Sequence, residues 1–356
     1  MLKKNVRSIV PAIVLALALT LVACGGGAAA PDTSDDGATE AETTDEEASG
    51  SDIRVGVVLD TGGENDKNFN EYTLAGVRDA ANELGIEFNY VVSGAPTEYE
   101  RNIENLIEEG HEMIVTVGFL MGEATQAAAE RHPDVSFAIV DVDFIDLPNV
   151  TGLVFAEDEV GFLAGALAGC MTETNTVSTV SGVDVPAVVK FVTGYQNGAL
   201  WANPDVETLN VYIPSFTDPT AGKQAGEEQI ANGSDVIFGV GGGTGNGGLL
   251  AAHEAGLMAI GVDVDQYFTY EEVQSSLLTS AAKNMDVAAA QAVRDYVNGE
   301  LEPGNRLSNL ENGGVGLAPF HEWEDRIQER GCDVVAEEAR EGLLSGELTT
   351  GYEPEG

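Results

Sequence analysis

The chain has 356 residues, and its 60 acidic and 16 basic side chains give a formal net charge of −44 at pH 7. This charge argues against binding to nucleic acid or to an anionic membrane surface, because both attract basic proteins. Hydrophobic residues make up 43% of the chain, so a core is available for one large domain or for two lobes. The acidity also predicts a high-salt habitat, where screening weakens the repulsion between exposed charges.

The first 23 residues have the pattern of an export signal. Basic residues precede an apolar run from 9 to 22, which is short for a membrane span of about 20 residues but suits a signal peptide. Leu21-Val22-Ala23-Cys24 and the glycines that follow resemble the bacterial lipobox, in which the cysteine is acylated and becomes the new N-terminus. An ordinary signal peptide with a nearby cysteine is the alternative. We expect a lipid on Cys24 to tether the protein to the outer face of the cell membrane.

Residues 24–52 are expected to form a solvated tether. After Cys24 they are rich in Gly, Ala, Ser, Thr and acidic residues and contain no Lys or Arg. Such a segment buries too little apolar surface to offset its ordering entropy, and its like charges keep it extended. The folded part is therefore expected to begin at residue 53.

From residue 53 onward, short apolar strands alternate with helices. The first series has predicted strands at 53–59, 86–92, 113–117 and 136–140, with helices at 72–84, 98–109 and 123–131. The second has strands at 176–181, 208–213, 236–240 and 258–262, with helices at 159–171, 185–201, 219–231, 248–255 and 286–298. This alternation predicts parallel sheets covered on both faces, one for each of two lobes.

The loop after the first strand holds unusual residues at the edge where such sheets bind ligands. Asp60 ends the strand, and the glycines at 62 and 63 allow a tight turn. Asn65 and Asp66 are placed to cap the helix that follows. Phe69 lies in a polar loop, where it either stacks on a flat ligand or covers the core of the loop itself.

This loop closely resembles the signature of the basic membrane protein family of ABC-transporter binding lipoproteins, in the purine-nucleoside-binding group. The family pattern is roughly Asp-x-Gly-Gly-x-Asn-Asp-Lys-Ser-Phe-Asn, and the chain departs from it at Asn68, where Ser is usual. The resemblance covers about 53 to 320 and continues through six further segments, at 118–121, 137–141, 215–219, 242–245, 261–266 and 279–283.

The resemblance implies a type I periplasmic-binding fold, an α/β architecture with two doubly wound parallel-sheet lobes joined by a hinge of three crossings. We expect one lobe to comprise 53–154 with 265–303, and the other 155–264 with 304–356. The protein would be a monomeric binding protein rather than an enzyme. It would pass a nucleoside to an ABC-transporter permease, without cofactor, metal or nucleic acid.

The resemblance also implies the roles of individual residues in a site between the lobes. Phe69 and Phe216 would hold the base between them, and Asp141 would accept hydrogen bonds from its edge, with Asp143 close enough to take that role instead. Asp263 and Lys283 would hold the ribose hydroxyls, although a purely structural ion pair is the alternative. The remaining expected contacts are Asp60, Asn70, Met121 and the backbone at Gly242.

Two enzymatic interpretations compete with this one. Residues 243–248 fit G-x-G-x-x-G after a predicted strand, with Asp263 about 20 residues on, as in dinucleotide-binding sites. We reject this because an exported enzyme would lack a supply of NAD, and close approach of a ribose also explains the glycines. Asp141, Asp143 and Asp146 suggest a cation site of an exported nucleoside hydrolase, but no G-x-S-x-G motif accompanies them. A nucleoside-sensing surface lipoprotein is a third possibility.

The cysteines leave one question open. Once Cys24 is lipidated, Cys170 and Cys332 either form a disulfide, which the compartment permits, or remain as buried thiols. The segment after Arg330 is expected to be a helix on the second lobe. Only four lysines follow the leader, which makes each of them of interest: Lys67, Lys190, Lys223 and Lys283.

Overall fold

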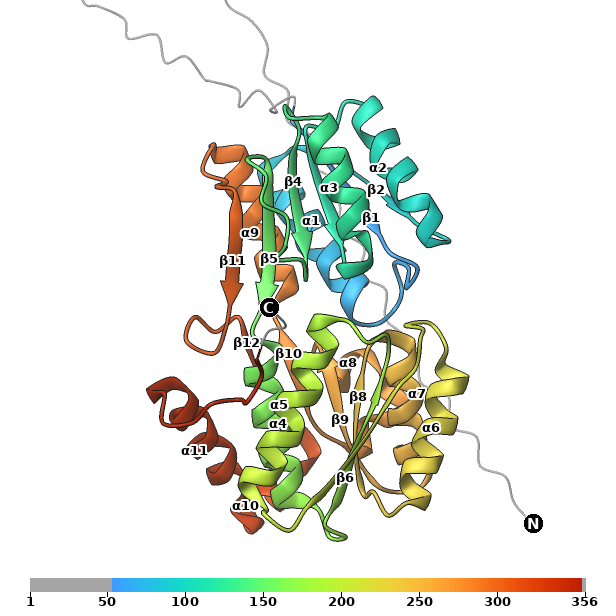
Figure 1. Cartoon of the computed structure of the whole chain (residues 1–356), viewed down its shortest axis with the longest axis vertical. Coiled ribbons are helices and arrows are strands. Elements are labelled where there is room, and N and C mark those ends of the chain that lie inside the picture. The colour runs from blue at the N-terminus through green and yellow to red at the C-terminus, as the bar shows by residue number, and fades with distance from the viewer. Residues whose placement is uncertain (1–52, 354–356) are drawn as a thin grey trace, which may run out of the picture. The chain divides into compact units, whose positions relative to one another are not determined.

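The computed structural model describes residues 53–353. The predicted export signal at 1–23, the lipidated Cys24 and the tether at 24–52 lie outside the described residues. Within the described part, none of the helices combines the length and apolar character that crossing a bilayer requires. The described chain forms two α/β lobes, and the sheet of each lies between helices (Figure 1).

The first lobe is built on a six-stranded parallel sheet in the order β11-β5-β4-β3-β1-β2. Its strands are β1 (Arg54–Leu59), β2 (Glu87–Val92), β3 (Met113–Val117), β4 (Ser136–Val140), β5 (Val150–Phe155) and β11 (Gly304–Ser308). Its helices are α1 (Phe69–Leu84), α2 (Tyr99–Glu108), α3 (Gly122–Arg131) and α9 (Met285–Asn298), with short 3-10 turns η1 (Pro96–Glu98) and η2 (Phe119–Met121).

The second lobe has a six-stranded sheet in the order β12-β10-β9-β8-β6-β7. Its strands are β6 (Thr176–Ser181), β7 (Glu207–Tyr212), β8 (Val236–Val240), β9 (Met258–Asp263), β10 (Leu277–Lys283) and β12 (Val315–Leu317). A parallel sheet was predicted for this lobe, but its edge strand β12 runs antiparallel to β10. Its larger helices are α4 (Glu157–Met171), α5 (Pro186–Ala202), α6 (Pro219–Ala231), α7 (Gly242–Glu254) and α11 (Cys332–Ser345). Shorter ones are α8 (Gln266–Thr269), η3 (Glu271–Ser276), η4 (His321–Trp323) and α10 (Glu324–Arg330).

The chain crosses between the lobes three times, from β5 to α4, from β10 to α9 and from β11 to β12. This confirms the predicted three-crossing hinge. The predicted lobe boundaries were wrong at two places. The stretch up to Lys283 belongs to the second lobe, because β10 pairs with β9, and 304–308 belongs to the first, because β11 pairs with β5. Strand β11 was not predicted from the sequence, because it is a half-exposed edge strand without an apolar run.

The helix pair α4 and α5 makes a rigid base for the hinge side of the second lobe. Gly161, Gly165 and Gly169 recur at one-turn spacing on α4 and face α5. A Cβ on Gly165 would overlap the carbonyl of Tyr195, so the two backbones approach more closely than larger residues would allow. This packing fixes the start of α4, which is one of the crossing points.

The two cysteines form a disulfide. Cys170, at the end of α4, bonds to Cys332, at the start of α11, with Cα atoms 5.7 Å apart. The bond holds α11 against α4 on the second lobe, where the helix after Arg330 was expected.

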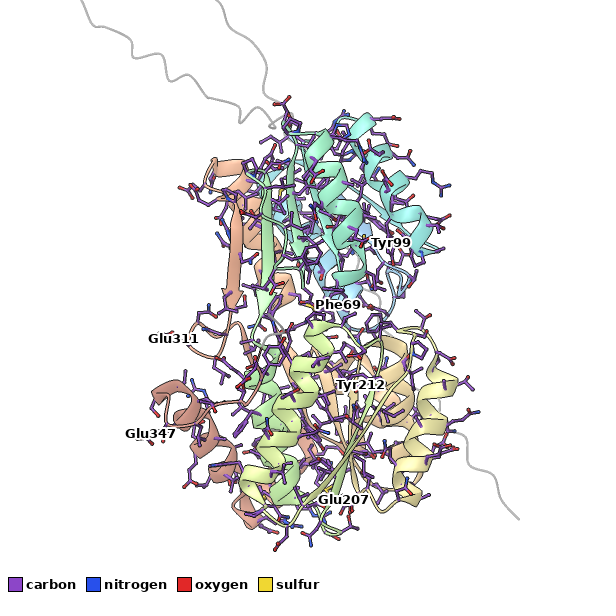
Figure 2. The ribbon with its side chains drawn as sticks, in the orientation of Figure 1. Phe69, Tyr99, Glu207, Tyr212, Glu311 and Glu347 are labelled. Atoms are coloured by element: carbon purple, nitrogen blue, oxygen red, sulfur yellow. A yellow bond between two sulfur atoms is a disulfide. The ribbon has the colours of Figure 1, made fainter. Side chains whose placement is uncertain are left out.

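Acidic side chains cover the outside of both lobes. Glu207, Glu311 and Glu347, for example, are exposed and lie on different elements of the surface (Figure 2). Cations pair with only some of these carboxylates. Most of the negative charge therefore stays unpaired on solvated groups, which repel one another.

Candidate functional site

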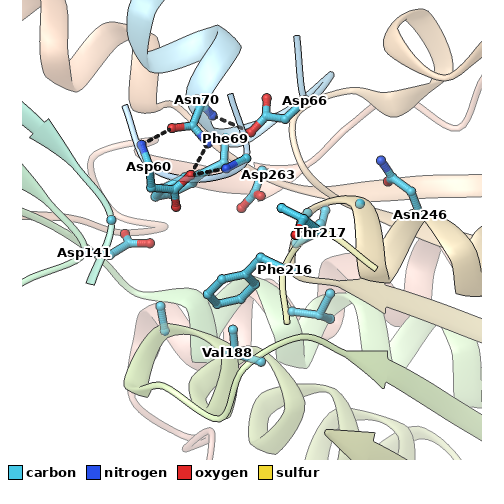
Figure 3. A pocket seen from close by; sticks show the side chains of 18 of the residues that line it. Asp60, Asp66, Phe69, Asn70, Asp141, Val188, Phe216, Thr217, Asn246 and Asp263 are labelled. Carbon is cyan, nitrogen blue, oxygen red and sulfur yellow. Dashed lines mark hydrogen bonds between the residues drawn. The ribbon is translucent and has the colours of Figure 1, made fainter. Parts of the chain in front are cut away.

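A cavity of about 400 Å³ lies between the carboxyl ends of the two sheets. Each sheet reverses its strand order there, at β1 and β3 in one lobe and at β6 and β8 in the other, and such reversals open a crevice in α/β sheets. Eight of the nine residues that were expected to contact the ligand line this cavity, namely Asp60, Phe69, Asn70, Asp141, Phe216, Gly242, Asp263 and Lys283. Figure 3 shows the cavity and labels most of these side chains.

Met121 does not belong to this lining, so its placement was wrong. The side chain is fully buried in the hydrophobic core, because the 3-10 turn η2 directs it inward. Its neighbours Phe119 and Leu120 line the cavity instead. Asp143 is exposed and lies outside the lining, whereas Asp141 lies within it.

The first loop is held by a dense hydrogen-bond network around Asn70. The Asn70 amide donates to Asp60 Oδ1 at 2.8 Å and to Asp66 Oδ2 at 2.9 Å, while its oxygen accepts from the backbone N–H of Asp60. The Asn70 side chain is therefore committed to shaping the loop. Burial raises the pKa of Asp60 to about 6 in spite of hydrogen bonds from Gly62 and Asn70, which lower it.

Two aromatic rings reach the cavity from opposite lobes. Phe69 opens α1, and Phe216 lies in the loop between β7 and α6 (Figure 3). Two glycines make room for the Phe216 ring, because a Cβ on Gly182 or on Gly241 would lie 2.5 or 3.2 Å from its Cδ1 atom. Gly242 has a φ of 61°, and a Cβ there would come within 2.8 Å of the Phe216 carbonyl oxygen. The glycine-rich segments thus position an aromatic ring.

The last residue of β10, Lys283, is the centre of a buried charge cluster. Its Nζ atom lies 2.6 and 2.8 Å from the two oxygens of Asp141, 3.2 Å from Glu157 Oε1 and 4.0 Å from Asp263 Oδ1. The nearest partner is therefore Asp141 rather than the expected Asp263. Asp141 belongs to the first lobe and Lys283 to the second, so this ion pair joins the lobes.

Burial controls the electrostatics of this cluster. It raises the pKa of Asp263 to about 7, and that of Glu157 also to about 7, although the Lys283 ammonium opposes both shifts. Burial alone would lower the pKa of Lys283, but the carboxylates of Asp141, Glu157 and Asp263 more than offset it and raise that pKa above its ordinary value. The ammonium is therefore charged at every physiological pH.

Three cavity residues hold a left-handed backbone that side chains rarely adopt. Lys67, Asp141 and Asp263 have φ angles of 65°, 64° and 67°. Such residues cost on the order of 1–3 kcal/mol each and persist where the surrounding structure enforces them. Their concentration around one cavity indicates that the positions of these side chains matter for function.

The dinucleotide-like motif is not a phosphate loop in this structure. Helix α7 already begins at Gly242, so residues 243–248 lie within it. Gly245 packs against the backbone of β8, Gly247 against α6 and Gly248 against Val180 of β6. The glycines serve helix packing, and only those at 241–243 line the cavity. The cation site suggested by Asp141, Asp143 and Asp146 is also absent, because no cluster of metal-ligating side chains occurs among residues 53–353.

Residues 53–341 match the model of the Bmp family, described as ABC transporter substrate-binding protein PnrA-like. The chain belongs to this family. The ABC transporter nucleoside-binding protein BmpA of Lactococcus lactis is 29% identical over 84% of this chain and 89% of its own. The CD4+ T-cell-stimulating antigen of Listeria innocua is 27% identical over 99% of this chain and 100% of its own. A solved ABC-transporter solute-binding protein from Aeropyrum pernix K1 has a TM-score of 0.73 at 27% identity, over 83% of this chain and 92% of that one.

As a Bmp family member, the protein is an ABC transporter substrate-binding protein with two lobes of the type I fold. Sequence reasoning missed several residues that line its cavity or brace it. Glu157 follows directly after the first crossing, and its acidic side chain at the start of a helix was the available indication. Asn246 and Tyr270 also line the cavity, and Tyr270 lies under the Lys67 ammonium, which is 5.1 Å from the ring centroid.

Proposed function

We propose that this Bmp protein captures purine nucleosides in the cleft and delivers them to the permease of an ABC transporter. The observation that carries the proposal is the pair of phenylalanine rings, Phe69 and Phe216, which face one cavity from opposite lobes among carboxylates. A lipid on Cys24 would keep the protein at the outer face of the cell membrane.

The two rings suit a flat heteroaromatic base. Stacking on one aromatic side chain stabilises a nucleic-acid base by about 1–3 kcal/mol. Asp141 lies at one end of the cavity (Figure 3), where its carboxylate would accept hydrogen bonds from N–H groups of the base edge. Although Lys283 pairs with both Asp141 oxygens, each oxygen keeps a further lone pair.

The charged groups suit an uncharged ribosyl group. Asp263 would accept from vicinal hydroxyls, and Lys283 would donate to them. Four carboxylates line the cavity, Asp60, Asp66, Asp141 and Asp263, against the two ammonium groups of Lys67 and Lys283. A phosphate would meet net repulsion there, which favours nucleosides over nucleotides.

Binding would depend on closure of the lobes, because neither lobe supplies both rings. A ligand held by Phe69 of one lobe and Phe216 of the other stabilises the arrangement in which the rings lie close together. The three crossings provide the hinge. The closed form would then dock on the permease.

Isothermal titration of the purified protein in high salt tests this proposal. The ligands are inosine, guanosine, adenosine and cytidine, and chromatography of each mixture detects free base. Micromolar or tighter binding of a purine nucleoside without turnover is the expected result. Release of free base would instead indicate a nucleoside hydrolase, and absence of heat with all four ligands would remove the nucleoside assignment.

A further inference from the structure

Behind the wall of the cavity, the fully buried residue Gln266 connects three elements of the second lobe through its side chain and its backbone N–H. Its Oε1 atom accepts from the backbone N–H of Val262 on β9 at 2.9 Å. Its Nε2 atom donates to Asn246 Oδ1 on α7 at 2.8 Å, and its backbone N–H donates to Ser280 Oγ on β10 at 3.1 Å. Gln266 itself does not line the cavity, whereas Asn246 does.

These bonds fix the polarity of the Asn246 amide. A backbone N–H can only donate, so the atom of Gln266 that faces Val262 must be the oxygen. The other Gln266 terminal atom is therefore the nitrogen, which can only donate, and so Asn246 must turn its oxygen toward it. The Asn246 Nδ2 group, a donor, is consequently left for the cavity side.

The surrounding packing keeps Gln266 in this position. A Cβ on Gly261 would lie 2.8 Å from Gln266 Oε1 and 2.5 Å from Ser280 Oγ, so only glycine leaves room for the buried amide. A connected network of buried polar groups of this kind is rigid when every member has its partner. Gln266 acts through Asn246 and is a positioning residue.

The Asn246 donor lies opposite the Asp141 end of the cavity. Figure 3 shows Asp141 and Asn246 on opposite sides of the labelled group, with Asp263 between them. If Asp141 meets the base edge and Asp263 the ribose hydroxyls, the 5′ end of the sugar points toward Asn246. The carboxylates of Asp66 and Asp263 line the same cavity and only accept when ionised, so Asn246 supplies a donor in a cavity where carboxylates predominate.

We propose that Asn246 Nδ2 donates a hydrogen bond to the 5′ oxygen of the bound nucleoside, and that Gln266 sets the direction of this donor. The identity of the ligand rests on the function proposed above. The polarity of the two amides follows from the hydrogen bonds of the protein alone.

The binding role is tested with Asn246→Leu, which removes the donor at similar volume and offers no acceptor to the 5′ hydroxyl in its place. We expect adenosine to bind about tenfold more weakly or worse, because the 5′ oxygen then has no side-chain donor. The matched control is Asn232→Leu, which makes the same change at an exposed position on the C-cap of α6 and should bind like the wild type.

The ligand 5′-deoxyadenosine separates this hydrogen bond from a general effect of the substitution. It lacks the 5′ oxygen, so Asn246→Leu should weaken its binding less than about threefold relative to the wild type. An equal loss for adenosine and 5′-deoxyadenosine would overturn the assignment of Asn246 to that oxygen.

The positioning role of Gln266 is tested with Gln266→Met, which removes the donor at similar volume. Adenosine affinity should fall, while the double variant with Asn246→Leu should lose no more than Asn246→Leu alone, since both changes act on one bond. Additive losses would show that Gln266 acts in some other way.

Side-chain amide NMR of the ligand-free protein gives a result that needs no nucleoside. The Gln266 Nε2 protons should be protected from solvent exchange, and the Asn246 Nδ2 protons should exchange quickly. Gln266→Met should leave the Asn246 amide without a fixed orientation. Rapid exchange at Gln266 would overturn the proposed polarity even if nucleosides bind. Conversely, protected Gln266 protons in a protein that binds no nucleoside would reject the proposed function and the 5′ contact while retaining the positioned donor.

Discussion

Replacement of Lys283 by methionine should destabilise the ligand-free protein strongly and in a pH-dependent manner. The Lys283 ammonium lies within 3.2 Å of Asp141 and Glu157 oxygens, and the Glu157 side chain is only 1% exposed. Lys283→Met keeps most of the buried stem but leaves these carboxylates without their shared cation. Removing one partner of a buried ion pair costs about 3–5 kcal/mol, so we expect a loss of that size at pH 8.

The pH dependence follows from the carboxylates that remain. Burial already raises the pKa of Glu157 and of Asp263 to about 7 in the presence of the cation. Without it, both values rise further, and the folded protein holds protons that the unfolded chain releases above about pH 4. Stability of the variant therefore falls as the pH rises from about 4 through the raised folded-state pKa values. The loss should be small at pH 5 and largest at pH 8.

Chemical denaturation at both pH values measures this loss, and Lys223→Met is the matched control. Lys223 Nζ lies 2.6 Å from Glu254 in a pair whose side chains are 31% and 52% exposed. Solvent screens an exposed pair of this kind, so it contributes little to stability. Equal effects of the two substitutions at pH 8, or a Lys283→Met loss independent of pH, would refute the reasoning.

Three further predictions concern the ligand, the disulfide and the acidic surface. Phe216→Ala should weaken nucleoside binding by about 1–3 kcal/mol, measured by titration, while the 66% exposed Phe268 tolerates the same change. Unchanged affinity would remove Phe216 from the site. Cys332→Ser opens a disulfide that joins positions 162 residues apart and should lower the free energy of unfolding by up to about 5 kcal/mol in denaturant titrations. Loss of the disulfide without any change in unfolding would contradict this. Multimolar salt should raise the melting temperature, given the net charge of −44, and equal melting in low and high salt would contradict a halophilic origin.

The fold was predictable where each element carries its own pattern. The strands at 113–117, 136–140, 176–181 and 236–240 match the structure at both ends, because each is rich in apolar or β-branched residues and is fully or almost fully buried. The last part of the chain was harder to assign. Edge strand β11 is half exposed and β12 has only three residues, and whether each joins one lobe or the other depends on pairing with distant strands.

The site was predictable to the extent that its residues lie in compact motifs. Asp60, Phe69 and Asn70 belong to one short segment that runs from the end of β1 to the first turn of α1, and a distinctive local sequence sufficed to identify them. The partner of Lys283 was not predictable in the same way, because Asp141 is 142 residues away and is brought near by the hinge. Burial and long-range geometry, rather than residue type, decide which carboxylate the ammonium contacts.

The few lysines of the described chain are concentrated around the cleft and the hinge. Three of the four in the described chain lie at the cleft or its crossings, where the compact ammonium reaches several groups at once. Lys283 joins the lobes through Asp141 on the hinge side, and Lys67 of the first lobe lies over Tyr270 of the second. Both contacts join the two lobes through side chains of the protein itself, so they favour the closed arrangement. Since apparent affinity scales with the population of the binding-competent form, these contacts raise affinity by populating that form.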